Sequence, residues 1–200
     1  IGNGAETIEA DQIICTIPLQ HLLPCLEGVP VAVTEACRAL VCNALICVNI
    51  GVKGPLSPVS WMYIPDKELG MTNRISFPSH FSAHAAPAGC SSILAEITHH
   101  PGDSASTMTD AELVAEVTGM LEQMGICTAD RIVYSSVCRQ PFAYVVYDLA
   151  YQKNIAIIKD YCASVGIPLV GRFAQFEYLN MDGVIRSAFD FIARETTSPK

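Results

Sequence analysis

The feature that most constrains the fold is a succession of apolar strands in the first half of the chain, with no long helix between them. We expect these strands at about Asn43 to Lys53, Trp61 to Ile64, Arg74 to Phe77 and Ser92 to Thr98. Parallel neighbours need a long crossover connection, so strands that follow one another closely pair antiparallel. The pattern therefore predicts an antiparallel sheet.

Helices and shorter strands are expected on both sides of this run. The clearest helix spans 110–124, where Thr109 and Glu112 form a capping box and Gly125 ends the helix. Further helices are expected at 19–27, 31–40, 150–165 and 183–194, and further strands at 12–17 (buried), 132–147 (a pair, with a break near Pro141) and 167–170. The chain is thus expected to have an α+β fold, an antiparallel sheet with packed helices.

The C-terminal part runs from a short apolar strand through a turn into an amphipathic helix. Gly171 and Arg172 form the turn, and the residues Asn180, Met181 and Asp182 stand where the helix begins. The apolar residues of this helix form one stripe that we expect to be buried, at positions 184, 185, 188, 189 and 192. A helix start carries free backbone N–H groups and the positive end of the helix dipole. This position therefore suits an anion or an electron-rich carbonyl.

Composition excludes some classes of partner. The net charge is -8 and lysines and arginines do not cluster, so neither nucleic acid nor an anionic membrane surface is an expected partner. The longest apolar run, Ala39 to Val52, is interrupted by asparagines and too short to span a bilayer. Only 16% of residues are charged, against about 25% in an average soluble domain. We therefore expect apolar surface to be hidden against a missing segment, a cofactor or another copy of the chain, which leaves a homo-oligomer open.

Cysteines and histidines give no metal motif. The chain has nine cysteines and no CxxC, and Cys42 and Cys47 have an odd separation that places them on opposite faces of one strand. We expect buried, reduced cysteines that act as small hydrophobes in the cytoplasm. His99 and His100 face opposite ways on a strand, with no further ligand at a suitable spacing, so no metal is predicted. GxSxG and GxxxxGK[ST] are absent, which leaves a hydrolase or a phosphate-loop enzyme without support.

Four segments, in order along nearly the whole chain, carry a resemblance to a known family. They are ADQIICTIPL (10–19), WMYIPD (61–66) with NRI (73–75) and FP (77–78), YVVYD (144–148), and GRFAQFEYLNMD (171–182). The chain resembles the superfamily of FAD proteins that contains amine oxidases, protoporphyrinogen oxidases and UDP-galactopyranose mutases. The last segment is similar to the closing flavin-binding signature and is the most specific of the four. In the third, Val145 and Val146 stand where the family usually has a proline.

The resemblance implies a domain organisation. Residues 25–148 would form a substrate-binding domain, flanked by strand and strand–helix pieces of an incomplete Rossmann-type FAD domain at 1–24 and 149–200. The GxGxxG turn that binds the FAD pyrophosphate is absent from the sequence. We therefore expect this piece to hold FAD weakly or not at all, to be inactive alone, and to have a missing N-terminal Rossmann segment as its partner in the full-length protein.

The resemblance also implies site residues, each with a plainer alternative. FAD would be bound by Gly171, Arg172, Tyr178, Asn180, Met181 and Asp182, and a small-molecule substrate by Arg74, Tyr144 and Tyr147. The alternatives are an ordinary helix cap at Asn180, a surface ion pair at Arg172, simple packing of the tyrosines, and a solvated strand arginine at Arg74. A catalytic residue is not identified.

Three functions follow as alternatives. The first is the substrate-binding half of an FAD-dependent oxidoreductase that transfers hydride from substrate to flavin. The second is a flavin isomerase of the UDP-galactopyranose mutase type, which should present several arginines to its substrate; only Arg74, Arg139 and Arg172 are candidates. The third is a non-catalytic binding module that has lost its Rossmann half.

Overall fold

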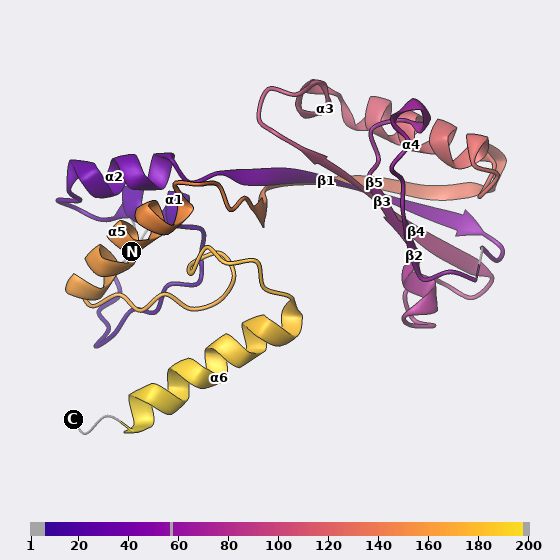
Figure 1. Ribbon diagram of the computed structural model, residues 1–200. Helices are drawn as coiled ribbons and strands as arrows, with labels where there is room; N and C mark the ends of the chain where they lie inside the picture. Colours follow the sequence, from indigo (N-terminus) through magenta and orange to yellow (C-terminus); the bar gives the residue numbers. More distant parts are fainter. Residues whose placement is uncertain (1–6, 57, 198–200) are drawn as a thin grey trace. The chain divides into compact units, whose positions relative to one another are not determined.

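The computed structural model describes residues 7–56 and 58–197 (Figure 1). The chain forms two compact units. The sheet unit is the middle of the chain, Asn43–Ala143, and the end unit combines the two ends, up to Cys42 and from Tyr144 onward. The fold is α+β, as the sequence predicts.

The sheet unit is built on a five-stranded antiparallel sheet with the order β2-β3-β4-β1-β5. Its strands are β1 (Cys42–Lys53), β2 (Trp61–Tyr63), β3 (Arg74–Ser76), β4 (Cys90–His99) and β5 (Ile132–Val145). The four strands expected between 43 and 98 are confirmed. The predicted break near Pro141 is wrong, because β5 continues through that residue. β5 is an edge strand, where a proline removes no ladder hydrogen bond if its nitrogen faces outward.

One face of the sheet carries the core of this unit. Residues at alternate positions of β1, among them Val48 and Ile50, are fully buried and pack with Leu113, Val117 and Leu121 of α4 (Asp110–Gln123). The short elements of the unit are η2 (Lys67–Leu69), η3 (Pro78–His80), α3 (Ser104–Thr107) and η4 (Ala129–Arg131). The opposite face, here called the open face, carries the alternate residues of the same strands.

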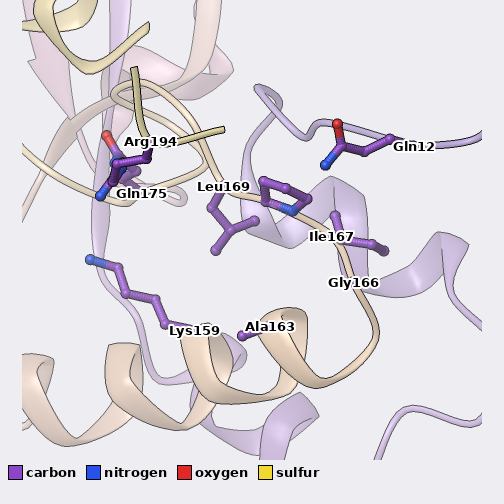
Figure 2. A pocket seen from close by; sticks show the side chains of 9 residues that line it. Gln12, Lys159, Ala163, Gly166, Ile167, Leu169, Gln175 and Arg194 are labelled. Carbon is purple, nitrogen blue, oxygen red and sulfur yellow. The ribbon is translucent and has the colours of Figure 1, made fainter. Parts of the chain in front are cut away.

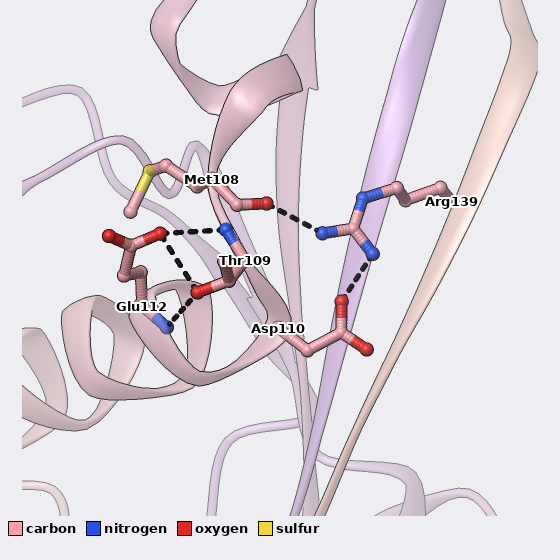
Figure 3. Close-up of polar contacts among 5 residues, drawn as sticks. All are labelled: Met108, Thr109, Asp110, Glu112 and Arg139. Atoms are coloured by element: carbon pink, nitrogen blue, oxygen red, sulfur yellow. Dashed lines mark hydrogen bonds and ion pairs between the residues drawn. The ribbon is translucent and has the colours of Figure 1, made fainter.

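The start of α4 is tied to the sheet (Figure 3). The hydroxyl of Thr109 accepts a hydrogen bond from the Glu112 N–H at 3.3 Å, and the Glu112 carboxylate accepts one from the Thr109 N–H at 2.7 Å. This is the predicted capping box. On β5, Arg139 donates to the Met108 carbonyl at 2.9 Å and forms an ion pair with Asp110. The side of α4 that faces the sheet is therefore fixed at its first turn.

The end unit is helical. It contains α1 (Leu19–Leu22), η1 (Leu23–Cys25), α2 (Val31–Arg38), α5 (Tyr151–Ser164) and α6 (Met181–Thr197). The predicted helices are confirmed, with 19–27 divided into α1 and η1. The buried residues Leu19, Cys37, Val145 and Ile158 belong to one core. Because of this packing, 25–42 and 144–148 lie in the end unit, whereas the sequence placed them with the sheet.

Two expectations about the end unit are wrong. Residues 12–17 and 167–170 do not form strands: one parallel bridge joins Cys15 to Leu169, and Ile13, Ile14 and Ile17 are exposed. The stripe on α6 is not buried either, since Ile185, Phe189 and Ile192 are 57%, 69% and 55% exposed. A strand needs neighbours at its edges and a stripe needs an opposing surface, and the described residues of this unit provide too little of either.

No helix in the described part of the chain has the length and apolar character needed to cross a membrane.

Candidate functional site

The turn before α6 depends on glycine. Gly171 has a φ of +85°, a left-handed conformation that side chains rarely adopt. Its N–H donates to the Ser187 hydroxyl at 3.2 Å, and that hydroxyl donates to the Gln175 side-chain carbonyl at 2.8 Å. The turn is therefore held against the second turn of α6, and its backbone approaches the helix closely.

Arg172 fixes the segment that leads into α6. Its guanidinium donates to the Leu179 carbonyl at 2.7 Å and lies 4.5 Å from the centre of the Tyr178 ring and 5.4 Å from that of Tyr144. The two rings are stacked, with centres 5.9 Å apart and planes 21° apart. Cation–π contacts of this kind hold a guanidinium in place while it keeps its charge. The structure thus brings the predicted residues Arg172, Tyr144 and Tyr178 together in a stacked group.

The start of α6 borders an open hollow of about 540 Å³. The hollow is lined by Arg172, Leu179, Asn180, Met181, Val184 and Ile185. The Val184 N–H donates to the Asn180 carbonyl at 2.9 Å, so the N–H groups of Met181, Asp182 and Gly183 precede the first helical hydrogen bond. A cation, helix-start N–H groups and apolar side chains meet here. This combination suits a planar apolar ring with an electron-rich carbonyl at its edge.

Contacts from Tyr147 and Tyr151 hold the backbone of residues 176–178, which lead into α6. The Tyr147 hydroxyl accepts a hydrogen bond from the Tyr178 N–H at 2.6 Å, and its ring meets that of Tyr151 edge to face at 4.6 Å. The Tyr151 hydroxyl donates to the Phe176 carbonyl at 2.9 Å. Burial, followed by the nearby Tyr147 and Glu177, raises the pKa of Tyr151 to about 12. In the structure, Tyr147, which the sequence predicts to bind substrate, positions the backbone of Tyr178.

Phe176 is a residue that the sequence did not indicate. It has a φ of +53°, which is an outlier for a bulky residue, and its side chain is buried. Strain of this kind persists where the surroundings fix the backbone, here through the bond from Tyr151. The pattern of apolar residues in the sequence does not predict this left-handed backbone.

The remaining predicted residue, Arg74, lies on the open face of the sheet unit. Its guanidinium bonds to the Glu96 carboxylate, with Nη2–Oε2 at 2.7 Å and Nε–Oε1 at 3.0 Å, and Glu96 is only 4% exposed. Arg74 is therefore engaged in a half-buried ion pair rather than fully solvated. The neighbouring strand presents Trp61 and Tyr63, 51% and 63% exposed, with rings 5.1 Å apart. Because Trp61 and Tyr63 are two residues apart on a strand, their spacing in the WMYIPD segment indicates that the two rings share one face.

A second hollow, of about 440 Å³, lies elsewhere in the end unit (Figure 2). It is lined by Gln12, Lys159, Ala163, Gly166, Ile167, Pro168, Leu169, Gln175 and Arg194. Lys159 forms an ion pair with Glu177 at 2.9 Å. The sequence did not indicate this hollow, because its lining comes from four separate segments.

Metal ligands are not gathered anywhere in residues 7–56 and 58–197: the structure shows no group of three or more His, Cys, Asp or Glu side chains that could hold an ion.

The family comparison gives a direct match. Residues 2–154 match the family described as flavin containing amine oxidoreductase. No match was found among curated proteins. The family match covers more than half of the chain and includes three of the four segments on which the resemblance rests.

Solved structures share the fold. Reduced UDP-galactopyranose mutase matches with a TM-score of 0.80 and 19% identity, over 96% of this chain and 43% of that one. A putative protoporphyrinogen oxidase from Exiguobacterium sp. 255-15 matches with 0.71 and 16%, over 92% and 41%. A putrescine oxidase triple mutant with redesigned cofactor binding matches with 0.57 and 14%, over 92% and 43%. The chain thus spans about two fifths of these structures, and at such identities the likeness concerns the fold alone.

Proposed function

The chain belongs to the flavin containing amine oxidoreductase family, and on this premise we propose that it supplies one wall of the flavin site and part of the substrate site of an FAD-dependent oxidoreductase. In the full-length protein, bound FAD would accept a hydride from the substrate. The residues of this chain would bind and orient the two molecules.

The observation that carries the proposal is the hydrogen bond of Arg172 to the segment just before α6. The bond from Arg172 to the Leu179 carbonyl orients the segment that ends in exposed N–H groups beside the hollow. Positive charge and helix-start N–H groups stabilise negative charge at a ring carbonyl. Met181, Asp182 and the preceding Asn180 would meet the carbonyl edge of the flavin ring, and Gly171 would let the backbone come close.

The fit to FAD extends to the ring and not to the pyrophosphate. The hollow has apolar walls of Leu179, Val184 and Ile185 and polar groups at one rim. The sequence has no GxGxxG, so phosphate binding by a glycine turn would come from other residues of the full-length protein. We therefore propose that the 200-residue chain binds FAD weakly and is inactive alone.

The substrate contacts are proposed for two places, each within its own unit. Tyr144 and Tyr147 stand beside Arg172 and Tyr178 in the end unit. On the open face of the sheet unit, Glu96 fixes the side chain of Arg74, which would reach an acidic group of the substrate. Trp61 and Tyr63 offer apolar ring faces on the same unit.

A mutase is the second candidate. It is favoured by the TM-score of 0.80 against reduced UDP-galactopyranose mutase. The mutase candidate is weaker because a diphosphate substrate needs several arginines that are not already engaged by the protein. Arg74 is bound to Glu96, Arg139 to Asp110, and Arg172 to Leu179. We therefore place the oxidoreductase first.

The test uses the full-length protein and its visible flavin absorbance. We expect Arg172→Ala to weaken FAD binding about tenfold, the effect of about 1.4 kcal/mol from a lost charged donor. Arg186→Ala is the matched control, because Arg186 is an exposed arginine on α6 itself and should leave the affinity unchanged. Anaerobic mixing with amines and with protoporphyrinogen should then bleach the oxidised flavin.

Three results would overturn the proposal. A full-length protein that purifies folded and colourless, and takes up no FAD, would be a binding module. Equal FAD affinity of Arg172→Ala and Arg186→Ala would show that Arg172 does not contribute to FAD binding. Isomerisation of UDP-galactopyranose by the reduced protein, without net flavin oxidation, would establish the mutase instead.

A further inference from the structure

Two cysteines face each other across the edge of the sheet. A Cβ atom placed on Gly51 of β1 would lie 3.0 Å from the Cβ of Tyr134 on β5, so these two residues are opposite each other. Two residues away on each strand, the Asn49 amide donates to the Ser136 hydroxyl at 3.3 Å. The numbers fall along β1 while they rise along β5, which is antiparallel pairing. One further step of two residues brings Cys47 opposite Cys138 on the same face.

We propose that Cys47 and Cys138 form a cross-strand disulfide when the protein meets an oxidised low-molecular-weight thiol of the glutathione class. Opposed residues of an antiparallel pair have Cα atoms about 4.5–5.5 Å apart, and disulfides join Cα atoms about 4.4–6.8 Å apart. The bond therefore forms without a shift of register. In the structure both cysteines are free thiols.

The exposure of the two thiols determines which cysteine attacks the small disulfide first. Cys138 is exposed, and the Gln140 amide donates to its sulfur at 3.2 Å. Cys47 is half-buried: burial, then Glu96 and Cys138, raise its pKa to about 11, against the opposing effect of Arg74. Cys47 is therefore protonated at neutral pH, and Cys138 reacts first.

The exchange balances without any other reactant. Cys138 loses its proton to solvent, and the resulting thiolate attacks one sulfur of the small disulfide. The S–S bond of the small disulfide breaks, and one small thiolate leaves and takes up a proton from solvent. Cys47 then loses its proton to solvent and attacks the Cys138 sulfur, and the second small thiolate leaves. Two protein thiols are oxidised to one disulfide, while one small disulfide is reduced to two thiols.

The disulfide would lie beside the ion pair of the open face. Across the sheet, Cys47 pairs with Glu96, Glu96 with Arg74, and Arg74 with Tyr63. Oxidation thus replaces a thiol next to Glu96 and joins the edge strand β5 covalently to β1. This inference does not rest on the proposed function, because no flavin or substrate takes part.

Peptide mapping tests the disulfide directly on the 200-residue chain. The protein is incubated with oxidised glutathione, its free thiols are alkylated before unfolding, and it is cut with trypsin without reduction. Tryptic cleavage gives Ile132–Arg139, in which Cys138 is the single cysteine, and Ala39–Lys53, which holds both Cys42 and Cys47. We expect these two peptides to be linked as the main product.

Two serine variants identify the partner. Cys42→Ser should keep the link, because Cys42 lies on the other face of β1, whereas Cys47→Ser should abolish it and leave Cys138 as a mixed disulfide with glutathione. Wild-type protein in which Cys138 stays unlinked after saturating treatment would overturn the proposal. Loss of the link in Cys42→Ser, with an unchanged circular dichroism spectrum, would also overturn it.

Discussion

The two units of the chain differ in how they bury their apolar residues. The sheet unit completes a core between one face of its sheet and α4, and the exposed Trp61 and Tyr63 lie on the other face. The end unit has a core around α1, α2 and α5, yet Ile185 and Phe189 of α6 remain exposed. The sheet unit therefore buries the apolar face of its sheet under α4, whereas the end unit keeps an exposed apolar stripe on α6.

The largest expected effect is in the core of the sheet unit. Leu121→Ala should lower the free energy of unfolding by about 3 kcal/mol, because it opens a cavity at a fully buried position. Ile185→Ala, on the exposed stripe of α6, should change it by less than about 0.5 kcal/mol. Urea unfolding followed by the fluorescence of the single tryptophan, Trp61, and by circular dichroism measures both. A comparable loss for the two variants would show that the α6 stripe is packed and would break the comparison.

A smaller effect separates the two arginine ion pairs of the sheet unit. Glu96→Gln should cost about 2 kcal/mol, because Glu96 is buried and the change removes the carboxylate with which the Arg74 guanidinium pairs. Asp110→Asn is the matched control, since its pair with Arg139 is exposed on both sides, and should cost about 0.5 kcal/mol. Equal losses in urea unfolding would contradict the assignment of Arg74 and Glu96 as a half-buried pair.

The smallest effect is in the end unit and depends on pH. Tyr151→Phe should cost about 1 kcal/mol through the lost bond to the Phe176 carbonyl. Burial raises the pKa of Tyr151 from 10.0 to about 12, so the folded state binds its proton more tightly than the unfolded state. The resulting stability is complete below pH 10 and is lost as the pH rises through 12.

The variant provides the control for that pH range. The stability advantage of wild type over Tyr151→Phe should fall between pH 10 and 12 by about 1.4 kcal/mol for each pH unit, which is enough to reverse its sign. A difference that stays constant over this range would mean that the Tyr151 hydroxyl is not buried. Titrating groups that do not interact with Tyr151 contribute equally to both proteins and cancel.

The sequence predicted the elements whose signals are local. The capping box of Thr109 and Glu112, the strands between 43 and 98 and the helix 150–165 each follow from periodicity or capping within a few residues. The failures concern features that depend on distant partners. Pro141 does not break β5 because that strand is at the edge. Residues 12–17 form no strand because, within residues 7–56 and 58–197, a single bridge from Leu169 pairs with them.

The candidate site shows the same division. The turn at Gly171 and the helix start at Asn180 are visible in the sequence as a glycine and the beginning of an amphipathic pattern. The stacking of Arg172 on Tyr144 and Tyr178 joins segments far apart in the chain, and the left-handed backbone of Phe176 is set by a tertiary hydrogen bond. The opposition of Cys47 and Cys138 likewise depends on strand register, which residue spacing within one strand does not fix.

The most direct measurement of the central claim is amide hydrogen exchange in the full-length protein with and without FAD. If the start of α6 is a wall of the flavin site, the N–H groups of Met181, Asp182 and Gly183 should exchange markedly more slowly with FAD bound. The amides of β1 and β4, in the core of the sheet unit, should be unchanged. Unaltered exchange at 181–183 in protein saturated with FAD would contradict the account.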